Sequence, residues 1–242
     1  MIQSALVIGA GGGIGQEIIT QLCSANPSAQ VHSVSRSAFG KEFTNQHHHI
    51  LDSTDEDAVK MLSQLFAADK VSFDTVICTT GVLHTSGDKT LKPEKRLEDI
   101  NTDQLAEYFR VNTAVPAVWL KHLVKLVSKQ GAKIVFFSAR VGSISENGLG
   151  GWYGYRASKA ALNMIVKTAS VEYKRRVPNT VLACYHPGTV DTDLSKPFQA
   201  NVKPGKLFTA RFTVSQLLSH MQGFDIELSP YYIDWDGQHI GY

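Results

Sequence analysis

The sequence predicts a doubly wound α/β fold, in which helices cover both faces of one parallel, seven-stranded sheet. Short apolar segments of strand length alternate with longer segments of helical periodicity along the 242 residues. The runs SALVIG and AKIVFFS are continuously apolar, as expected of parallel strands that are buried on both faces. No linker, internal repeat or low-complexity segment divides the chain, so we expect residues 1–242 to form one domain.

The first half of the chain supplies four of the expected strands. The first strand ends in glycines, and the helix that follows stops at Asn26-Pro27. The next helix begins with three acidic residues, which favour the positive end of a helix dipole. The strands are expected at residues 4–9, 30–36, 47–51 and 73–81, and the helices at residues 14–25 and 55–67.

The second half contains two long helices and the last three strands. Residues 102–128 keep helical spacing throughout, and Pro116 lacks a backbone donor, so we expect a bend there. A polar stretch with prolines at residues 193–212 predicts a loop-rich lid over a substrate pocket. Strands are expected at residues 132–138, 180–188 and 230–235, and helices at residues 155–175 and 213–221.

Composition argues against several classes of protein. The net charge of +2, with no stripe of lysine and arginine, predicts no nucleic-acid partner. No apolar run approaches the roughly 20 residues that cross a membrane. Three dispersed cysteines and the absence of a basic leader predict a reduced, cytoplasmic protein. Consecutive residues of a strand face opposite sides, so His47-His48-His49 predicts no metal site.

The turn after the first strand is a candidate site for a dinucleotide. Ile14 occupies the last position of G-x-G-x-x-G, so the spacing that fits is G-x-x-x-G-x-G. Glycines permit positive φ and close backbone approach, and the following helix N-terminus offers N–H groups to a pyrophosphate. A merely tight turn is the alternative. The candidate residues are Gly9, Gly11, Gly13, Ile14 and Gly15.

The end of the second strand predicts which dinucleotide binds. A site for NAD usually has a carboxylate about 20 residues beyond the glycines. Ser35, Arg36 and Ser37 stand there instead, with no acid nearby. A guanidinium helped by a hydroxyl can pair with a 2′-phosphate, so we expect NADP(H) to be preferred over NAD(H). The alternative is a solvated arginine in a loop.

Tyr155 and Lys159 are candidates for proton transfer. They are four residues apart in a helical segment and therefore share one face. Tyr153 lies off that face, and we expect it to line a pocket wall. A free tyrosine has a pKa near 10, and an adjacent ammonium favours the phenolate. The string Y-x-x-x-K is common, however, and is more often a surface pair than a catalytic one.

Three motifs together resemble the short-chain dehydrogenase/reductase family over nearly the whole chain. They are the glycine turn, Y-x-x-x-K followed by A-A-L-N, and P-G-T-V-D-T at residues 187–192. Residues 138–164 and the later LSKPF look most like the C-factor/sniffer-type carbonyl reductase branch. The resemblance implies a Rossmann-type fold, hydride transfer between NADP(H) and a carbonyl or secondary alcohol, and a homodimer or homotetramer packed through the two long helices.

The resemblance also implies roles at matching positions. Tyr155 would be the general acid in reduction and the base in oxidation, and Lys159 would hold the nicotinamide ribose and lower the tyrosine pKa. Asn112 would position a water that relays protons to Lys159. Asp52 would bind the amino group of the adenine. Val190 and Thr192 would hold the carboxamide of the nicotinamide. Cofactor contacts are implied at Asp52, Ser53, Thr79, Thr80, Gly81, Tyr155, Lys159, Pro187, Gly188, Val190 and Thr192.

The chain departs from the family pattern at two places. Thr79-Thr80-Gly81 replaces N-A-G, and Ala139 stands where the second residue of a Ser-Ser pair usually polarises the carbonyl. Ser138 or Ser143 could supply that hydroxyl, or no serine acts. A signalling protein that binds NADP(H) with little turnover is therefore the alternative function.

Some residues near the expected pocket remain open to two interpretations. His186 could line the pocket, although a structural histidine with satisfied hydrogen bonds is favoured. Phe198, Leu207 and Phe208 could supply apolar walls, which would suit a small hydrophobic or aromatic carbonyl.

Overall fold

The computed structural model describes residues 2–38, 43–85 and 91–242. The strands of its main sheet are β1 (Ser4–Ile8), β2 (Gln30–Ser35), β3 (Gln46–Ile50), β4 (Thr75–Cys78), β5 (Ala132–Phe137), β6 (Thr180–His186) and β9 (Tyr231–Asp234). They pair in parallel in the order β3-β2-β1-β4-β5-β6-β9. This confirms the predicted doubly wound fold, whose strand order reverses between β1 and β4.

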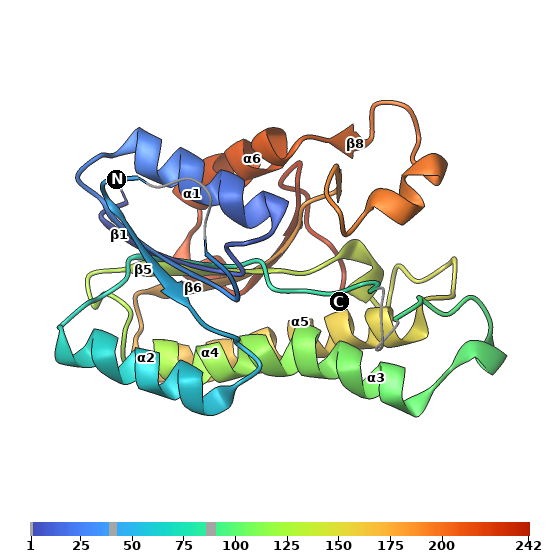
Figure 1. Ribbon diagram of the computed structural model, residues 1–242, viewed down its shortest axis with the longest axis horizontal. Coiled ribbons are helices and arrows are strands. Elements are labelled where there is room, and N and C mark those ends of the chain that lie inside the picture. Colours follow the sequence, from blue (N-terminus) through green and yellow to red (C-terminus); the bar gives the residue numbers. More distant parts are fainter. Residues whose placement is uncertain (1, 39–42, 86–90) are drawn as a thin grey trace.

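Helices cover both faces of the sheet (Figure 1). Their bounds are α1 (Gly13–Ala25), α2 (Glu56–Ala68), α3 (Thr102–Phe109), α4 (Val115–Leu123), α5 (Tyr153–Arg176) and α6 (Ala210–Gln222). Alternation along β5 sends Ile134 and Phe136 into the core under α2, α4 and α5. Val135 and Phe137 enter the core under α1 and α6 instead.

The expected single helix at residues 102–128 is interrupted, but before Pro116 rather than at it. A wide turn at Arg110–Ala114 separates α3 from α4, and the N–H of Val115 donates to the carbonyl of Arg110. Pro116 lies in the first turn of α4. Because proline has no N–H, the usual helix bond to the carbonyl of Asn112 cannot form, and the backbone widens just ahead of it. Asn112 therefore lies within the irregular turn.

The stretch at residues 193–212 is more ordered than the predicted loop. It contains a 3-10 helix at Lys196–Asn201 and strand β8 (Leu207–Phe208), which pairs with β7 (Thr189–Val190) in a small second sheet. α6 already begins at Ala210. The ring of Phe208 packs on Trp235 with centroids 4.5 Å apart. This long-range contact fixes the segment and leaves no periodic signal in the sequence.

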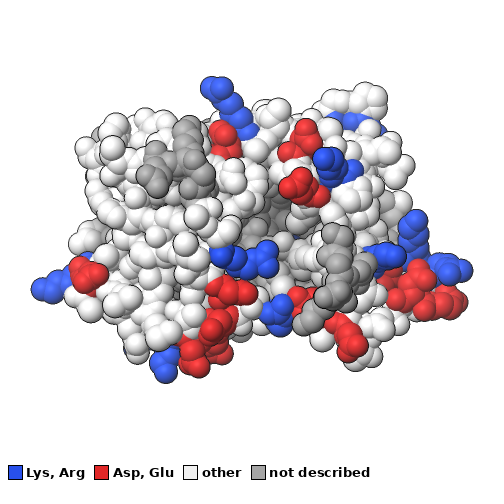
Figure 2. All heavy atoms as spheres, viewed as in Figure 1, with Lys and Arg blue, Asp and Glu red and all other residues white. Residues whose placement is uncertain are grey.

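The surface seen in Figure 2 has basic and acidic side chains interspersed, with no basic stripe. None of the described helices combines the length and the apolar character that crossing a membrane requires.

Candidate functional site

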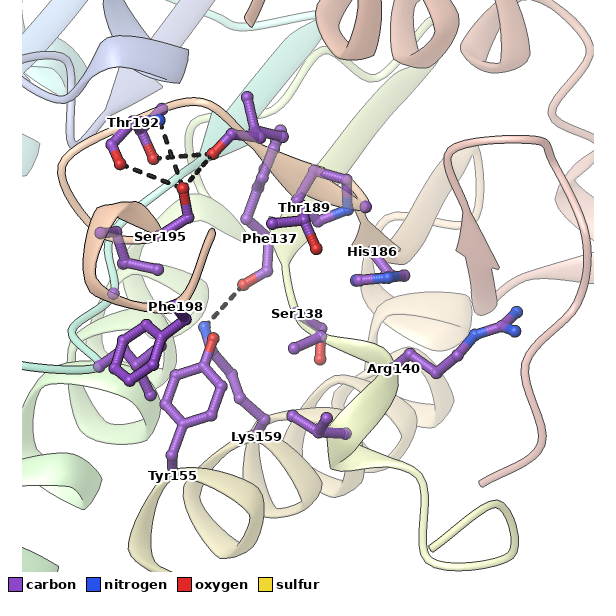
Figure 3. A pocket seen from close by; sticks show the side chains of 18 of the residues that line it. Phe137, Ser138, Arg140, Tyr155, Lys159, His186, Thr189, Thr192, Ser195 and Phe198 are labelled. Atoms are coloured by element: carbon purple, nitrogen blue, oxygen red, sulfur yellow. Dashed lines mark hydrogen bonds between the residues drawn. The ribbon is translucent and has the colours of Figure 1, made fainter. Parts of the chain in front are cut away.

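A pocket of about 530 Å³ opens at the carboxyl ends of the central strands. Segments from the glycine turn, from β4 to β6, from the start of α5 and from residues 186–206 line it (Figure 3). Carboxyl ends of strands at the switch point of such a sheet are where ligands bind in this architecture. The predicted site residues that line this pocket are Ile14, Thr79, Gly81, Ser138, Tyr155, Lys159, Pro187, Gly188, Val190 and Thr192.

Tyr155 and Lys159 both enter the pocket from the first turns of α5 (Figure 3). Both side chains are buried. The Nζ of Lys159 donates to the carbonyl of Phe137 at the end of β5, at 2.8 Å. It lies 5.9 Å from the centre of the Tyr155 ring. The helix spacing and the bond to β5 together fix both groups at one wall of the pocket.

Burial controls the proton affinity of both groups. It lowers the pKa of Lys159 to about 8, because the ammonium loses its hydration. It also raises the pKa of Tyr155 above its ordinary value, which is opposite to the direction expected from an adjacent ammonium. The cost of burying a phenolate outweighs any attraction to Lys159 in this structure. Tyr155 is therefore a protonated phenol at neutral pH, which is the form of an acid.

Asn112 lies behind the pocket and holds the chain after β4. Its Oδ1 accepts the N–H of Val82 at 2.7 Å, and its Nδ2 donates to the carbonyl of Val82 and to Ser158 Oγ, each at 3.0 Å. Gly81 lies between the Asn112 and Lys159 side chains. A Cβ there would come within 3.2 Å of the Lys159 Nζ and 3.4 Å of the Asn112 Oδ1. Glycine at this position therefore leaves room for both polar groups.

The two candidate serines occupy different surroundings. Ser138 lines the pocket, and its Oγ donates to Asn163 Oδ1 at 2.6 Å. Ser143 is buried, outside the residues that line the pocket, and its Oγ donates to the carbonyl of Gly241 near the C-terminus. Ala139 lines the pocket without a hydroxyl, as its sequence position suggested.

A buried carboxylate organises the start of α5, and sequence reasoning missed it. Glu94 is 1% exposed, and its two carboxylate oxygens accept the N–H of Gly154 at 3.3 and 3.2 Å. Its carbonyl accepts the N–H of Trp152, which has φ of 53° in the left-handed region. A negative charge near the first N–H groups of a helix is stabilising. Glu94 therefore anchors the turn that delivers Tyr155.

Trp152, rather than Tyr153, lines the pocket. Its ring makes edge contacts with Tyr155 and Phe198, with centroids 6.1 and 5.0 Å away. Two glycines with positive φ, Gly150 and Gly151, precede it and let the chain turn the indole inward. The Gly150-Gly151 pair was the feature of the sequence from which this turn, and the inward position of Trp152, could have been predicted.

The apolar wall differs in part from the expected one. Phe198 lines the pocket, together with Leu194 and Val202. Leu207 and Phe208 do not belong to the lining. Phe208 instead covers Gly188, where a Cβ would lie 2.6 Å from its ring. The strand pairing of β8 directs Phe208 onto Gly188 and Trp235, away from the cavity.

His186 lines the pocket and is not the satisfied structural histidine that the sequence favoured. Its Nδ1 is buried and has no hydrogen-bond partner. Burial and the nearby Arg140 lower its pKa to about 4, although Asp234 acts in the opposite direction. The imidazole is therefore neutral at physiological pH.

The glycine turn has the shape that a dinucleotide pyrophosphate requires. Gly9 has φ of 85°, and a Cβ there would lie 2.7 Å from Thr79 Oγ1. A Cβ on Gly15 would lie 2.5 Å from the carbonyl of Gly9, so both positions need glycine. Because the N-cap residue of α1 is Gly12, no capping side chain bonds the first N–H groups of the helix, and its first turn holds no acidic residue. This end of the helix therefore suits an anion.

The other glycines of the turn face neighbouring segments. A Cβ on Gly11 would lie 3.4 Å from the Cβ of Ser35, and one on Gly13 would lie 3.2 Å from Thr192 Cγ2. Thr79 donates to the carbonyls of Ile8 and Gly9 at 3.2 and 3.0 Å, so it braces the turn where the family has asparagine. Thr80 also adjoins the turn: a Cβ on Gly9 would lie 2.9 Å from the backbone nitrogen of Thr80.

The ends of β2 and β3 lie side by side, at some distance along the sheet from the pocket lining. Ser35 is buried, with its Oγ donating to the carbonyl of Ser37 at 2.6 Å, whereas Arg36 is exposed. Asp52 closes a turn, because its Oδ1 accepts hydrogen bonds from the backbone N–H and the hydroxyl of Thr54. These bonds, together with the nearby Arg36, hold the pKa of Asp52 below the usual range. Ser53 Oγ accepts the Nε1 of Trp119 at 3.2 Å. Arg36 and Asp52 thus belong to one surface region.

The segment after β6 closes the pocket on the side of the glycine turn. The carbonyl of Pro187 accepts the hydroxyl of Thr213 at 2.8 Å, and Gly188 has φ of 76°. The carbonyl of Val190 accepts the hydroxyls of Ser195 and Thr192, at 2.5 and 3.4 Å (Figure 3). These bonds fix the loop that contains Val190 and Thr192, the residues expected to bind the carboxamide of the nicotinamide.

The three histidines in succession do not converge. Within residues 2–38, 43–85 and 91–242, no group of three or more histidine, cysteine, aspartate or glutamate side chains is arranged to hold a metal ion. His47 and His49 share one face of β3 and stack on His32 of β2.

Curated proteins similar to this chain include three with stated activities or roles. The 1-hydroxy-2-glutathionyl-2-methyl-3-butene dehydrogenase of Rhodococcus sp. (strain AD45) is 29% identical over 148 residues, which are 61% of this chain and 60% of that protein's length. C-signal of Myxococcus xanthus is 31% identical over 146 residues, 60% of this chain and 82% of that protein. A benzil reductase ((S)-benzoin forming) of Bacillus subtilis (strain 168) is 23% identical over 202 residues, 82% of this chain and 79% of that protein.

Solved structures with the same fold include two carbonyl reductases. Carbonyl reductase Sniffer of D. melanogaster has a TM-score of 0.85 and 21% identity, with all of both chains covered. The NADPH-bound carbonyl reductase from chicken fatty liver also has a TM-score of 0.85, with 20% identity over 100% of this chain and 94% of that one. The family model described as short chain dehydrogenase matches residues 3–203. The chain therefore belongs to the short chain dehydrogenase family, as its three motifs predicted.

Proposed function

We propose that the protein is an NADP(H)-dependent oxidoreductase that reduces a carbonyl, or in the reverse direction oxidises a secondary alcohol. One observation carries the proposal: Tyr155, Lys159 and Ser138 line a single pocket, next to a glycine turn shaped for a pyrophosphate. The names of the benzil reductase and of the carbonyl reductases with the same fold support this class of reaction.

The proposed chemistry divides between cofactor and protein. NADP(H), when bound, supplies or accepts the hydride. Tyr155 donates its phenolic proton to the carbonyl oxygen, which its buried, protonated state favours. Lys159 holds the nicotinamide ribose and returns a proton to Tyr155. The carbonyl of Asn112, which Pro116 leaves without its helix donor, positions the water that supplies Lys159.

Ser138 is proposed as the group that polarises the carbonyl. Its hydroxyl is in the pocket, whereas that of Ser143 is bonded to the C-terminal segment. Ser138 donates to Asn163 Oδ1, so rotation about its side-chain bond is needed to aim the proton at a substrate. Ser138 directly follows Phe137, the last residue of β5, and its side chain lines the pocket.

NADP(H) is proposed over NAD(H) because Ser35 ends β2 and Arg36 follows it, at the place where an acid would otherwise bind the ribose 2′-OH. We also propose cofactor contacts in the roles that the family resemblance implies. They are the glycines of the turn after β1, Asp52, Ser53 and the residues of the loop 187–192. The NADPH-bound state of the chicken carbonyl reductase supports NADP(H), the dinucleotide that carries a 2′-phosphate.

The proposal extends to assembly and location. We expect one domain, in a cytoplasmic homodimer or homotetramer that packs through α4 and α5. A groove lined by Leu120 and Ile165 runs between these helices, and Met164 and Val171 of α5 are 64% and 58% exposed. Burying such side chains favours association. Sedimentation velocity checks this, and a monomer at micromolar concentration would contradict it.

A signalling protein that binds NADP(H) with little turnover is the second candidate. The resemblance to C-signal and the alanine at position 139 favour it. It predicts tight NADPH binding by fluorescence but no loss of NADPH absorbance with benzil, aromatic ketones, aldehydes or quinones.

The decisive test compares two tyrosines. Tyr155→Phe should lower kcat with benzil by about 10²–10⁴-fold, while NADPH affinity stays the same, because only the proton donor is lost. Tyr153→Phe is the matched control, since this tyrosine lies outside the pocket lining two residues away, and it should retain full turnover. Undiminished turnover in Tyr155→Phe would exclude the proposed mechanism.

A further inference from the structure

The charged side chains that line the pocket share one sign. Among the described residues they are Arg140, Lys159, Lys203 and Lys206, and no aspartate or glutamate of the described chain belongs to the lining. The protein as a whole is nearly balanced, with 24 basic and 22 acidic residues, and both signs are interspersed on the surface in Figure 2. A hollow lined by cations attracts anionic ligands and raises their local concentration.

Two of these cations are already engaged within the protein. The Nζ of Lys159 donates to the carbonyl of Phe137 and belongs to the proposed proton path. The Nη2 of Arg140 donates to Asp234 Oδ2 at 2.8 Å, and its Nε lies 3.6 Å from Glu146 Oε2. These two carboxylates offset the charge of Arg140, so the attraction of the pocket for an anion comes mainly from the other two cations.

Lys203 and Lys206 are not compensated in this way. Neither forms an ion pair with an acidic side chain of the described residues. Both are exposed at the mouth of the pocket, in the segment between the 3-10 helix at Lys196–Asn201 and β8. The Nζ of Lys206 lies over the ring of Trp235, 4.8 Å from its centre. The face of an indole attracts a cation, so this contact holds the Lys206 ammonium at the pocket.

The position of Lys206 relative to the proton donor follows from the small second sheet. Leu207 of β8 is paired with Thr189 of β7, so Lys206, one residue earlier, adjoins the Thr189 side of the cavity. Figure 3 shows Thr189 across the cavity from Tyr155 and Phe198. A ligand that reaches from Tyr155 to Lys206 therefore passes the aromatic wall and ends at an ammonium group.

We infer that Lys206, together with Lys203, binds a carboxylate of the substrate. The substrate class is then carbonyl compounds that have an aromatic or other apolar body and a carboxylate away from the reacting carbonyl. This inference rests on the proposed function. The carbonyl carbon accepts the hydride that NADPH supplies and its oxygen accepts the proton of Tyr155, so NADPH becomes NADP⁺, the carbonyl becomes an alcohol and the carboxylate stays unchanged.

Two aromatic aldehydes with carboxylates, and their primary amides, test the assignment. They are para-formylbenzoate and para-formylcinnamate, in which a vinyl group moves the carboxylate further from the aldehyde. The amides have nearly the same size and planar shape but carry no charge. The readout is the ratio of kcat/KM for each carboxylate to that for its amide, because comparison of this ratio between variants cancels the intrinsic reactivity of the aldehydes.

The variants separate charge at the pocket from charge nearby. Lys206→Met removes the charge and keeps an unbranched apolar side chain on Trp235, whereas Lys206→Arg keeps the charge. The double variant Lys203→Met/Lys206→Met removes both lysines. Lys196→Met is the matched control, because this exposed lysine lies on the same segment but outside the pocket lining.

We expect Lys206→Met to lower the carboxylate-to-amide ratio about fivefold for one or both aldehydes, as for one exposed ion pair, and the double variant to lower it about tenfold or more. The loss should be in KM rather than kcat, because the carboxylate is bound equally before and during hydride transfer. Lys206→Arg and Lys196→Met should keep the ratio of wild type.

Three results would overturn the inference and leave the reductase function intact. An unchanged ratio in the double variant would show that the lysines bind no carboxylate. An equal fall in Lys196→Met would show that only the general field of the surface acts. A Kd for NADPH that rises in the double variant by as much as the ratio falls would assign the lysines to the phosphates of the cofactor.

A binding measurement covers the case in which the protein turns over none of the aldehydes. Calorimetry of the NADP⁺-loaded protein compares para-hydroxymethylbenzoate and para-hydroxymethylcinnamate with their primary amides. A preference of wild type for a carboxylate that the double variant abolishes supports the inference even if the proposed reductase activity fails. Equal affinity for carboxylates and amides, or no binding of either carboxylate at millimolar concentration, overturns it.

Discussion

The two halves of the site are built differently. In the cofactor half, two polar groups at the ends of β2 and β3 are held by neighbours close in sequence: Ser35 by Ser37, and Asp52 by Thr54. In the reaction half, the bonds that hold the start of α5 and Ser143 join distant segments, Glu94 with Gly154 and Ser143 with Gly241. Short-range turns therefore form part of the cofactor half, whereas contacts across the whole fold are needed to place the proton donor.

This difference predicts how substitutions act. Changes in the cofactor half should alter affinity for the dinucleotide and leave the chemical step alone. Changes in the reaction half should alter kcat or the stability of the fold, depending on whether the side chain faces the pocket or a distant segment.

The largest expected effect separates the two serines of the reaction half. Ser138→Ala should lower kcat by about 10²–10³-fold, because a donor to the developing charge on the carbonyl oxygen is lost. Ser143→Ala should leave kcat within about twofold and lower the free energy of unfolding by about 1 kcal/mol, since its buried bond to Gly241 is lost. Steady-state kinetics and urea unfolding of both variants measure this. A larger kcat loss in Ser143→Ala would reverse the assignment.

The contrast between the two serines shows what sequence alone could predict. The sheet and its helices followed from apolar runs and helical spacing, and Tyr155 and Lys159 followed from helix spacing, because these patterns are local. The choice between Ser138 and Ser143 depended on where β5 ends and on a bond across the fold to Gly241. Neither leaves a periodic trace in the sequence.

Glu94 and Trp152 were missed for a related reason. A glutamate is normally solvated, and nothing around position 94 marks this one as buried at the start of a helix 60 residues later. The order within residues 193–212 was missed because β8 forms only through pairing with β7. The prolines and glycines of this segment indicated turns correctly but could not indicate the partner strand.

The next effect tests the cofactor half. Arg36→Ala should raise the Kd for NADPH about tenfold or more and leave the Kd for NADH unchanged, because a charge-assisted bond to the 2′-phosphate is lost. Fluorescence titration with each nucleotide measures it. Arg175→Ala, at the exposed end of α5, is the control for net charge and should change neither value. Equal weakening of NADPH and NADH in Arg36→Ala would mean that this arginine does not read the phosphate.

The smallest expected effect concerns acid stability at the β2–β3 edge, beside the cofactor half. Burial, with help from His47 and His49, lowers the pKa of His32 to about 4. The unfolded chain, with an ordinary pKa near 6.5, therefore binds more protons between these values, and stability must fall as the pH drops through that window.

His32→Leu tests this linkage with little change in packing, because His32 already lies against the rings of Phe66 and Phe73. Wild type should lose on the order of 1 kcal/mol of unfolding free energy between pH 7 and pH 5 that the variant retains. Urea unfolding at the two pH values measures the difference. The pH profile of kcat should be the same in both proteins, because His32 is outside the pocket lining. A shared loss of stability would place the acid-sensitive group elsewhere, and a shift in the kcat profile would show that the sheet edge and the reaction half are coupled.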